Sequence, residues 1–455
     1  MKTENSSFRD RDGFVFYSNA EVFRFIKPTY LSTFNEMVNN GFLSKLIEKK
    51  YLVNYEESAE EFNFTEGKVI KQEKINFISY PYEWSFYQLK KAALLTLKIQ
   101  LFCLENGYSL KDASSFNIQF KGTNPIFIDT LSFEKYVEGK PWSAYRQFCQ
   151  HFFAPLVLQS YGIDKLNKYL IENIEGVPLD LCASILPFYS KLNLSVYLHI
   201  HLNSKFEKKH KEDLSFKNKK IAVNKSKLIS IIKYLIYNTE KLKLPKNKTN
   251  WTDYYKEFTY NEANFREKKI FIEKNTALIK PEFTIDCGSN TGVFSEIASI
   301  YSSNVLSFDF DSSVIHQQCK VFSSKKISNV LPLVQDLCQP SPSIGWWNKE
   351  RKSFLERLPE NSCTLALALI HHLVLSNNLT FNMVAELFAS FSKNLLIEFV
   401  TKEDPQSQRL LVSKKDIFDD YTQFNFEKSF SEHFKLVEKS ELTDSTRVMF
   451  FYTKK

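Results

Sequence analysis

The stretch FTIDCGSNTGVFSEIASI, residues 283–300, decides the fold of the C-terminal half of the chain. An apolar run is followed by a turn that contains Gly288 and Gly292, and then by an amphipathic segment. A glycine-rich turn from a strand into a helix lets the backbone approach a ligand closely and directs free amides at it. The chain has only 11 glycines among 455 residues, so two glycines four positions apart indicate a ligand-binding turn.

The residues around these glycines restrict the class of ligand that the turn can bind. Asn290 stands where the dinucleotide fingerprint G-x-G-x-x-G needs its second glycine, which disfavours a nicotinamide cofactor. Asp286 comes just before the first glycine. A carboxylate there repels a pyrophosphate but suits a ligand with an ammonium or sulfonium charge.

Beyond residue 280, short apolar strands alternate with helical segments, which predicts a doubly wound, largely parallel α/β sheet. Asp309 ends the second strand about 20 residues after the turn, where a carboxylate can hold both ribose hydroxyls. Asp311 is the competing ribose candidate, although it also suits a helix N-cap. Asp336 ends the third strand, where it can accept a hydrogen bond from an adenine amino group.

In this order the motifs resemble those of class I S-adenosylmethionine-dependent methyltransferases. The resemblance covers residues 280 to 455 and includes FDFD (308–311), QDL (335–337) and LALALIHHL (365–373). It implies a Rossmann-like seven-stranded sheet whose seventh strand is antiparallel, with S-adenosyl-L-methionine as cofactor. The cofactor-binding residues that it implies are Asp286, Gly288, Asn290, Gly292, Asp309, Asp336 and Leu337.

Methyl transfer needs a nucleophile in line with the sulfonium and sometimes a base that takes its proton. The ends of the fourth and fifth strands offer candidates. For the histidine pair we expect one ring packed inside and one ring facing a cleft, whereas Glu398 also fits a strand-end carboxylate paired with a Lys or Arg. The candidate catalytic residues are His371, His372 and Glu398, with Glu403 and Asp404 as further candidates.

Two segments are candidate lids over such a site. The insertion CQPSPSIGWWNKERKSFLERLPEN, residues 338–361, carries Trp346 and Trp347, for which packing is the commoner role of the two. Upstream of the first strand, packing is at least as common a role as closing over the cofactor for Tyr254, Tyr255 and Tyr260.

The N-terminal half carries a second constellation. Asp112 and Asn117 are five residues apart, and Asp129 follows after a predicted hairpin. This spacing resembles the catalytic loop and metal-binding strand of the protein-kinase fold, in which the first Asp is the base and the other two residues hold magnesium. Leu110-Lys111 and Thr130-Leu131 depart from the kinase motifs, and no glycine-rich loop precedes them. Lys27 fits a surface lysine better than a phosphate-binding one.

We therefore expect an α+β kinase-like region at residues 1–160, a mostly helical continuation and linker at 161–275, and a methyltransferase domain at 276–455. Nearly the whole chain is similar to a bacterial family of methyltransferases related to the nodulation protein NoeA. One hypothesis is methyl transfer to an unidentified acceptor selected by the N-terminal region. The alternatives are a phosphotransferase with the C-terminal domain as a regulatory S-adenosylmethionine sensor, and a cofactor-binding scaffold without catalysis.

Composition limits the remaining possibilities. No run of about 18 apolar residues predicts a membrane span, and the N-terminus has no apolar signal core, so we expect a cytoplasmic protein. Seven cysteines lack metal-ligand spacing, which favours buried reduced thiols and no metal. The lysine-rich stretch 204–227 predicts a solvated loop more than a nucleic-acid surface.

Overall fold

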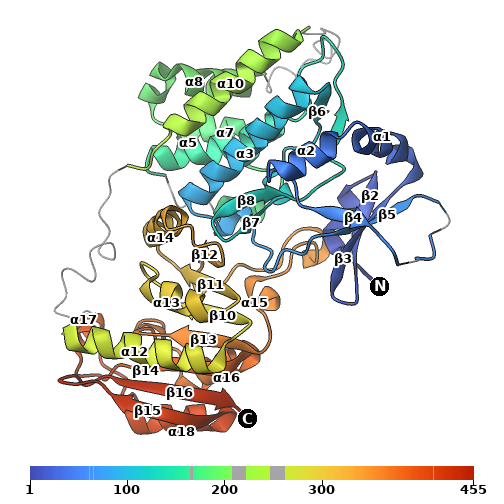
Figure 1. Ribbon diagram of the computed structural model, residues 1–455. Helices are drawn as coiled ribbons and strands as arrows, with labels where there is room; N and C mark the ends of the chain where they lie inside the picture. Colours follow the sequence, from blue (N-terminus) through green and yellow to red (C-terminus); the bar gives the residue numbers. More distant parts are fainter. Residues whose placement is uncertain (61, 65, 164–167, 207–221, 246–261, 413–414) are drawn as a thin grey trace. The chain divides into compact units, whose positions relative to one another are not determined.

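The structure is a computed structural model that describes residues 1–60, 62–64, 66–163, 168–206, 222–245, 262–412 and 415–455 (Figure 1). The described residues form two compact units. Unit 1 comprises residues 1–120, 124–245 and 342–352, and unit 2 comprises residues 121–123, 262–341 and 353–455. Unit 1 thus includes 11 residues, 342–352, that interrupt the sequence of unit 2.

Unit 2 is built on a seven-stranded sheet in the order β12-β11-β10-β13-β14-β16-β15. The first five strands of this order are parallel, while β16 is antiparallel to both β14 and β15. The chain moves outward from β10 to β12 and then returns to β13 on the other side of β10. A reversal of this kind is the topological switch point at which open α/β sheets bind their ligands, at the carboxyl ends of the strands. The strands are β10 (Phe283–Cys287), β11 (Asn304–Asp309), β12 (Val330–Val334), β13 (Ser362–Ala366), β14 (Ser392–Phe399), β15 (Phe434–Glu441) and β16 (Val448–Lys454).

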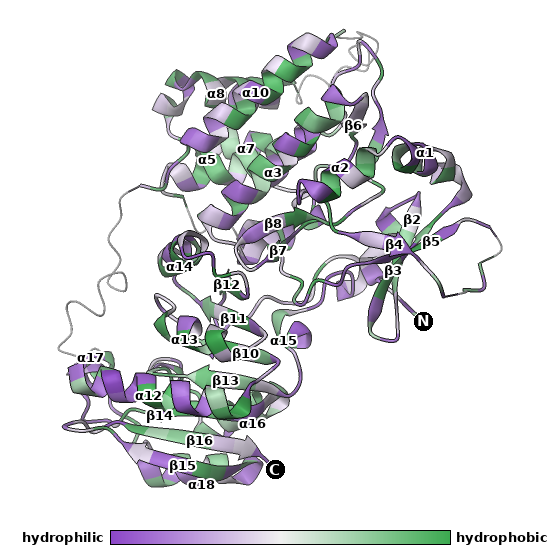
Figure 2. Ribbon diagram, in the orientation of Figure 1, coloured by the Kyte–Doolittle hydropathy of each residue, from purple (hydrophilic) through white to green (hydrophobic). Residues whose placement is uncertain are grey.

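The parallel strands are short and mostly hydrophobic because helices cover a sheet of this kind on both faces (Figure 2). All five residues of β13 are buried, as are the last five of β11. Side-chain caps start several of the helices; Thr380 caps α16 and Thr422 caps α18. The helices are α12 (Glu262–Ile279), α13 (Val293–Tyr301), α14 (Ser312–Ser324), α15 (Phe354–Arg357), η10 (His372–Ser376), α16 (Phe381–Phe391), α17 (Pro405–Leu411) and α18 (Gln423–His433).

Unit 1 begins with a five-stranded antiparallel sheet in the order β1-β2-β3-β5-β4. Phe16, Phe23 and Phe25 form its hydrophobic cluster. The hairpin expected between Asn117 and Asp129 is confirmed, since β7 pairs with β8, and β2 pairs with β3 in a further hairpin. The strands are β1 (Lys2–Thr3), β2 (Gly13–Ser18), β3 (Glu21–Ile26), β4 (Tyr55–Glu57), β5 (Lys68–Gln72), β6 (Tyr108–Leu110), β7 (Ile118–Lys121), β8 (Asn124–Phe127) and β9 (Phe133–Lys135).

Helices make up most of the remainder of unit 1. The longest is α3, which starts at a capping box formed by Ser85 and Gln88 and buries residues on several sides. Among the described residues, no helix is long and apolar enough to span a bilayer. The principal helices are η1 (Asn5–Arg9), α1 (Pro28–Asn39), α2 (Phe42–Glu48), α3 (Phe86–Glu105), η4 (Cys149–Phe153), α5 (Ala154–Ser160), α7 (Leu179–Ile185), η6 (Phe188–Leu192), α8 (Leu194–Val196), η7 (Tyr197–Leu202) and α10 (Lys225–Lys241).

Candidate functional site

The glycine turn lies between β10 and α13, at the carboxyl end of β10. Gly288, Asn290 and Gly292 all have left-handed backbone conformations, with φ of 70°, 47° and 82°. A Cβ atom on Gly292 would lie 2.6 Å from the Phe322 ring, so this position needs glycine for space as well as for conformation. The amides of Gly288 and Ser289 both donate to the carbonyl of Phe308, each at 3.0 Å, which ties the turn to β11.

Asp309, the last residue of β11, supports this turn directly. Its Oδ2 accepts the amide of Asn290 at 3.0 Å, and its Oδ1 accepts the amide of Asp311 at 3.0 Å. Burial raises the pKa of Asp309 to about 6. The side-chain Oδ1 of Asn290 is buried and has no hydrogen-bond partner among the described residues. Since buried polar atoms are nearly always paired, this atom indicates a ligand group beside the turn.

Asp286 lies beneath the turn, with 3% of its surface exposed. It accepts a hydrogen bond from Ser295 Oγ at 2.5 Å, and burial raises its pKa to about 7. A buried carboxyl group with a raised pKa gains stability from a cation nearby, because the opposite charge favours its ionised form. This environment fits a ligand with an ammonium or sulfonium group.

The other proposed cofactor contacts follow β11 and β12. Asp336 and Leu337 are half-buried and lie just past the end of β12, and Asp336 Oδ1 accepts the amide of Cys338 at 2.9 Å. Asp311 is the N-cap of α14 and accepts the amide of Ser313 at 2.8 Å. Its interpretation as a helix cap is therefore confirmed.

The histidine pair follows the end of β13. Their rings lie 4.2 Å apart, His371 is fully buried and His372 is partly buried. Burial lowers the pKa of His372 to about 4 and that of His371 well below its ordinary value, so both rings are neutral at pH 7. Neither ring nitrogen of His371 has a hydrogen-bond partner among the described residues. Leu369, two residues earlier, lies 3.2 Å from where a Cβ on Gly288 would stand, which brings this segment against the glycine turn.

Glu398, at the end of β14, is the centre of a buried charge network. Lys268 Nζ and Arg447 Nη1 lie 2.5 Å and 3.2 Å from its Oε1, and the amide of Ala368 donates to its Oε2 at 2.9 Å. Burial opposes ionisation, but the two cations hold the pKa of Glu398 below its usual range. Arg447 also binds Asp404 through two hydrogen bonds of 2.7 Å and 3.1 Å.

A catalytic role for Glu398 does not fit this geometry, because both of its oxygens are already occupied. Its contact with Ala368, which has φ of 48°, instead fixes the turn that leads to the histidines. Asp404 is similarly engaged by Arg447, as well as capping α17. Neither Lys268 nor Arg447 was expected at this site from the sequence. The signal for Lys268 was its spacing from the apolar Phe271 and Ile272, which places it on the buried side of α12.

In unit 1, the three residues of the kinase-like constellation do come together. The hydroxyl of Ser132 links two of them, because it donates to Asp129 and accepts a hydrogen bond from Asn117 Nδ2 at 3.4 Å. Asn117 in turn donates to Asp112. However, Arg24 of β3 forms an ion pair with Asp129. Burial acts in the opposite direction, but Arg24 and Ser132 hold the pKa of Asp129 below its usual value.

The arrangement does not fit a magnesium site. The guanidinium of Arg24 stands where a cation would have to approach Asp129, and the amide of Leu131 donates to the same carboxylate at 3.0 Å. Within the described part of the chain, no group of three or more His, Cys, Asp or Glu residues is placed to hold a metal ion.

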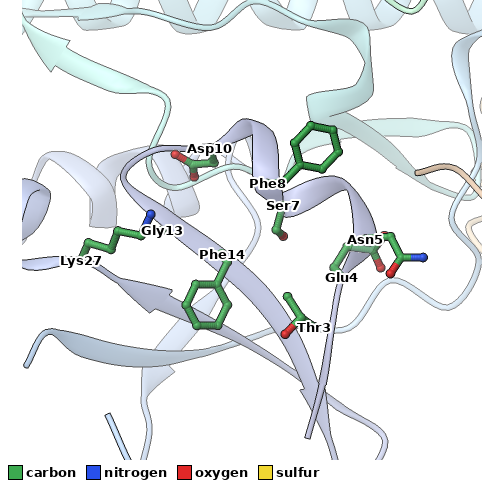
Figure 3. A pocket seen from close by; sticks show the side chains of 9 residues that line it. All are labelled: Thr3, Glu4, Asn5, Ser7, Phe8, Asp10, Gly13, Phe14 and Lys27. Atoms are coloured by element: carbon green, nitrogen blue, oxygen red, sulfur yellow. The ribbon is translucent and has the colours of Figure 1, made fainter. Parts of the chain in front are cut away.

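A pocket of about 400 Å³ lies beside η1 and β2 of unit 1 (Figure 3). Glu4 and Asp10 contribute carboxylates to its lining. Lys27 also lines it, but its ammonium donates to the carbonyl of Arg11 at 3.0 Å. Two carboxylates beside one engaged lysine repel a phosphate group more than they attract it.

The tryptophans of the insertion are exposed, so the expectation that they pack in a core is wrong. Trp346 and Trp347 are 72% and 76% exposed, and Trp347 has a left-handed φ of 58°. Their loop is anchored within unit 1 by the buried Glu350, which pairs with Arg9 of η1 at 2.5 Å and 3.1 Å. The expected lid tyrosines 254, 255 and 260 lie outside the described residues.

Comparison with solved structures finds methyltransferases that match part of the chain. The N-methyltransferase NodS from Bradyrhizobium japonicum WM9 is 11% identical, with 43% of this chain and 99% of NodS covered and a TM-score of 0.31. WbdD, described as a bifunctional kinase-methyltransferase, is 15% identical, with 46% of this chain and 42% of WbdD covered and a TM-score of 0.32.

Sequence comparison gives a full-length relative, although no protein-family model matches the chain. The nodulation protein NoeA of Rhizobium meliloti (strain 1021) is 31% identical over 458 residues, which cover 98% of this chain and 95% of NoeA. The resemblance to this family expected from the sequence is thereby confirmed. The chain belongs to the family of the nodulation protein NoeA.

Proposed function

We propose that unit 2 is an S-adenosylmethionine-dependent methyltransferase domain of the Rossmann-like type, and that unit 1 selects the methyl acceptor. The observation that carries the first part is the turn after β10. It combines a left-handed backbone at three positions, an unpaired buried acceptor on Asn290, and two buried carboxyl groups with raised pKa values, Asp286 and Asp309. This set fits a cationic nucleoside at the switch point of the sheet.

Each residue then has a defined role toward the cofactor. Gly288 and Gly292 shape the turn, and Asp286 balances the positive charge of the methionine moiety. Asp309 accepts hydrogen bonds from the ribose, while Asp336 and Leu337 contact the adenine. When bound, S-adenosylmethionine supplies an electrophilic methyl group.

The residues after β13 act on the acceptor side. His371 is neutral because of its burial, so one ring nitrogen can accept a hydrogen bond from an acceptor group, while its lowered pKa makes it a weak proton acceptor. Glu398, held by Lys268 and Arg447, positions the turn that carries His371 and His372.

Support for acceptor selection by unit 1 comes from the loop at residues 342–352. This loop lies between β12 and β13 in sequence, yet it belongs to unit 1 and presents two exposed tryptophans there. Exposed tryptophans on an anchored loop are common anchors for a bound partner. We do not propose phosphotransfer, because Arg24 neutralises the carboxylate that would have to hold magnesium.

The experiment is transfer of a labelled methyl group from S-adenosylmethionine into fractionated cell extract, followed by identification of the labelled molecule. We expect label in one fraction, less label with Trp346→Ala/Trp347→Ala, and unchanged affinity of that variant for S-adenosylhomocysteine. Phe424→Ala, which alters an equally exposed aromatic residue of unit 2, serves as the control. Absence of label in every fraction, with folded protein that binds the cofactor, would favour the non-catalytic scaffold.

A further inference from the structure

Unit 1 exposes a group of large hydrophobic side chains along residues 185–198. This stretch runs from the end of α7 through η6 and α8 into η7, and these elements pack against one another. Single exposed apolar residues are ordinary, but a contiguous group marks a contact surface. We define the apolar patch as Ile185 (36% exposed), Phe188 (81%), Tyr189 (61%), Leu192 (87%), Leu194 (61%) and Leu198 (36%).

The backbone beneath the patch is held in place. Ser190 is fully buried, and its hydroxyl lies 2.8 Å from His201 Nε2. Asn193 caps α8 by accepting the amides of Ser195 and Val196 at 3.1 Å and 3.3 Å. Ser190 and Asn193 thus fix the shape of this stretch, while the six residues of the patch remain exposed.

Within residues 181–206 the charged side chains have one sign, and the nearest acidic residue in the sequence is Asp180 at the start of α7. Residues 181–206 contain no aspartate or glutamate but include two lysines, Lys191 and Lys205, both exposed. The ammonium of Lys191 lies 4.5 Å from the centre of the Phe188 ring, so positive charge and apolar surface are adjacent. Phe206, at the end of this stretch, is 48% exposed.

Exposed leucines, phenylalanines and a tyrosine interspersed with lysines have the chemistry of a segment that lies in a membrane interface. The apolar side chains enter the boundary between headgroups and acyl chains, and the lysines attract anionic headgroups. Acidic residues, which an anionic surface would repel, are absent from residues 181–206.

We propose that the apolar patch docks the protein reversibly on the surface of an anionic lipid bilayer. The six apolar side chains enter the interface, and Lys191 and Lys205 contact lipid phosphates. This proposal does not depend on methyl transfer. It adds a place of action, at a membrane surface, where an amphiphilic acceptor would be concentrated.

The test is sedimentation of the full chain with vesicles of phosphatidylcholine alone and of phosphatidylcholine mixed with phosphatidylglycerol. We expect binding to the anionic vesicles that weakens with added salt, and a loss of roughly tenfold or more in Phe188→Glu/Leu192→Glu. The matched control is Leu278→Glu/Phe424→Glu in unit 2, where the side chains are 72% and 76% exposed. It should bind as the unaltered protein does.

Lys191→Ala/Lys205→Ala provides a second variant that leaves the apolar side chains in place. It should lower binding to anionic vesicles and leave the melting temperature unchanged. The proposal is overturned if the unaltered protein does not bind anionic vesicles, or if the patch variants and the control bind equally well. Self-association that disappears in Phe188→Glu/Leu192→Glu, without vesicle binding, would instead assign the patch to contact with a second copy of the chain.

Discussion

Asp286 and Asp309 are buried carboxyl groups at the proposed cofactor site, and their burial changes their pKa values. Their pKa values are raised by burial to about 7 and about 6. Folding therefore favours their protonated forms, so their contribution to the unfolding free energy is fully present below pH of about 4 and is lost as pH rises through about 6 and 7. A cationic ligand favours the ionised forms instead.

From this we predict that the affinity for S-adenosylmethionine rises with pH between about 5 and 8, as the two carboxyl groups ionise. Calorimetry in buffers of different ionisation enthalpy should show proton release on binding in the same range. Asp286→Asn should flatten the upper part of the profile. A flat profile in the unaltered protein would contradict a role for Asp286 beside the cation.

A second prediction concerns the contribution of Asp129 to the stability of unit 1. Asp129→Ala removes the nearest partner of Arg24, whose side chain is only 7% exposed, and leaves it with Asp10 at 3.5 Å, so it should lower the unfolding free energy of unit 1 by about 2 kcal/mol. Thermal unfolding without nucleotide or metal measures this. Arg24→Met/Asp129→Leu should recover part of the loss, since it removes the charges of this pair and leaves only Asp10, which is 27% exposed, without its cation. Stabilisation of the unaltered protein by magnesium, absent from Asp129→Ala, would contradict the ion-pair role.

At the scale of elements, the loop at residues 342–352 depends on one buried carboxylate. Glu350 binds Arg9 and also accepts the amide of Trp346 at 3.0 Å. Glu350→Ala should speed hydrogen exchange across residues 344–351, at a cost of about 1 kcal/mol because the Arg9 side chain is 43% exposed. Hydrogen exchange measured by mass spectrometry tests this, with Glu356→Ala in the α15 cap as control. Equal exchange in the two variants would show that Glu350 does not anchor the loop.

The elements also show what the sequence predicts and what it does not. Local patterns were sufficient for the strand, turn and helix around Gly288 and Gly292, for the Asp311 cap and for the hairpin between Asn117 and Asp129. They were insufficient where a residue finds its partner far along the chain. Lys268 and Glu398 are 130 positions apart, and Arg24 and Asp129 are 105 apart, so only the fold reveals that each pair is joined.

The exposure of the two tryptophans likewise could not be predicted from the local sequence pattern. Tryptophan is usually a packing residue, but Trp346 and Trp347 are exposed. Their loop is held through Glu350 by Arg9, which is more than 300 positions away in the sequence. The spacing of Asp112, Asn117 and Asp129 marks a group of residues that the fold does bring together. Their spacing does not disclose Arg24, which changes what the cluster can bind.

At the scale of the whole molecule, the chain combines an α/β unit with an α+β unit. The strand order of the α/β unit reverses at β10. The α+β unit includes residues 342–352, which lie within the sequence of the α/β unit. The sequence similarity to NoeA covers 98% of this chain and 95% of NoeA, so it spans both units. The proposed division of labour assigns the cofactor to unit 2, and the acceptor and a lipid surface to unit 1.

The central claim, that unit 2 binds S-adenosylmethionine at the ends of β10 and β11, is tested most directly by calorimetric titration of the full chain with S-adenosylhomocysteine. We predict saturable binding to the unaltered protein that weakens by about 1–3 kcal/mol in Asp309→Ala, the scale of hydrogen bonds lost to a charged group. Phe424→Ala should bind as the unaltered protein does. No binding of S-adenosylhomocysteine or S-adenosylmethionine to the folded protein would contradict the claim.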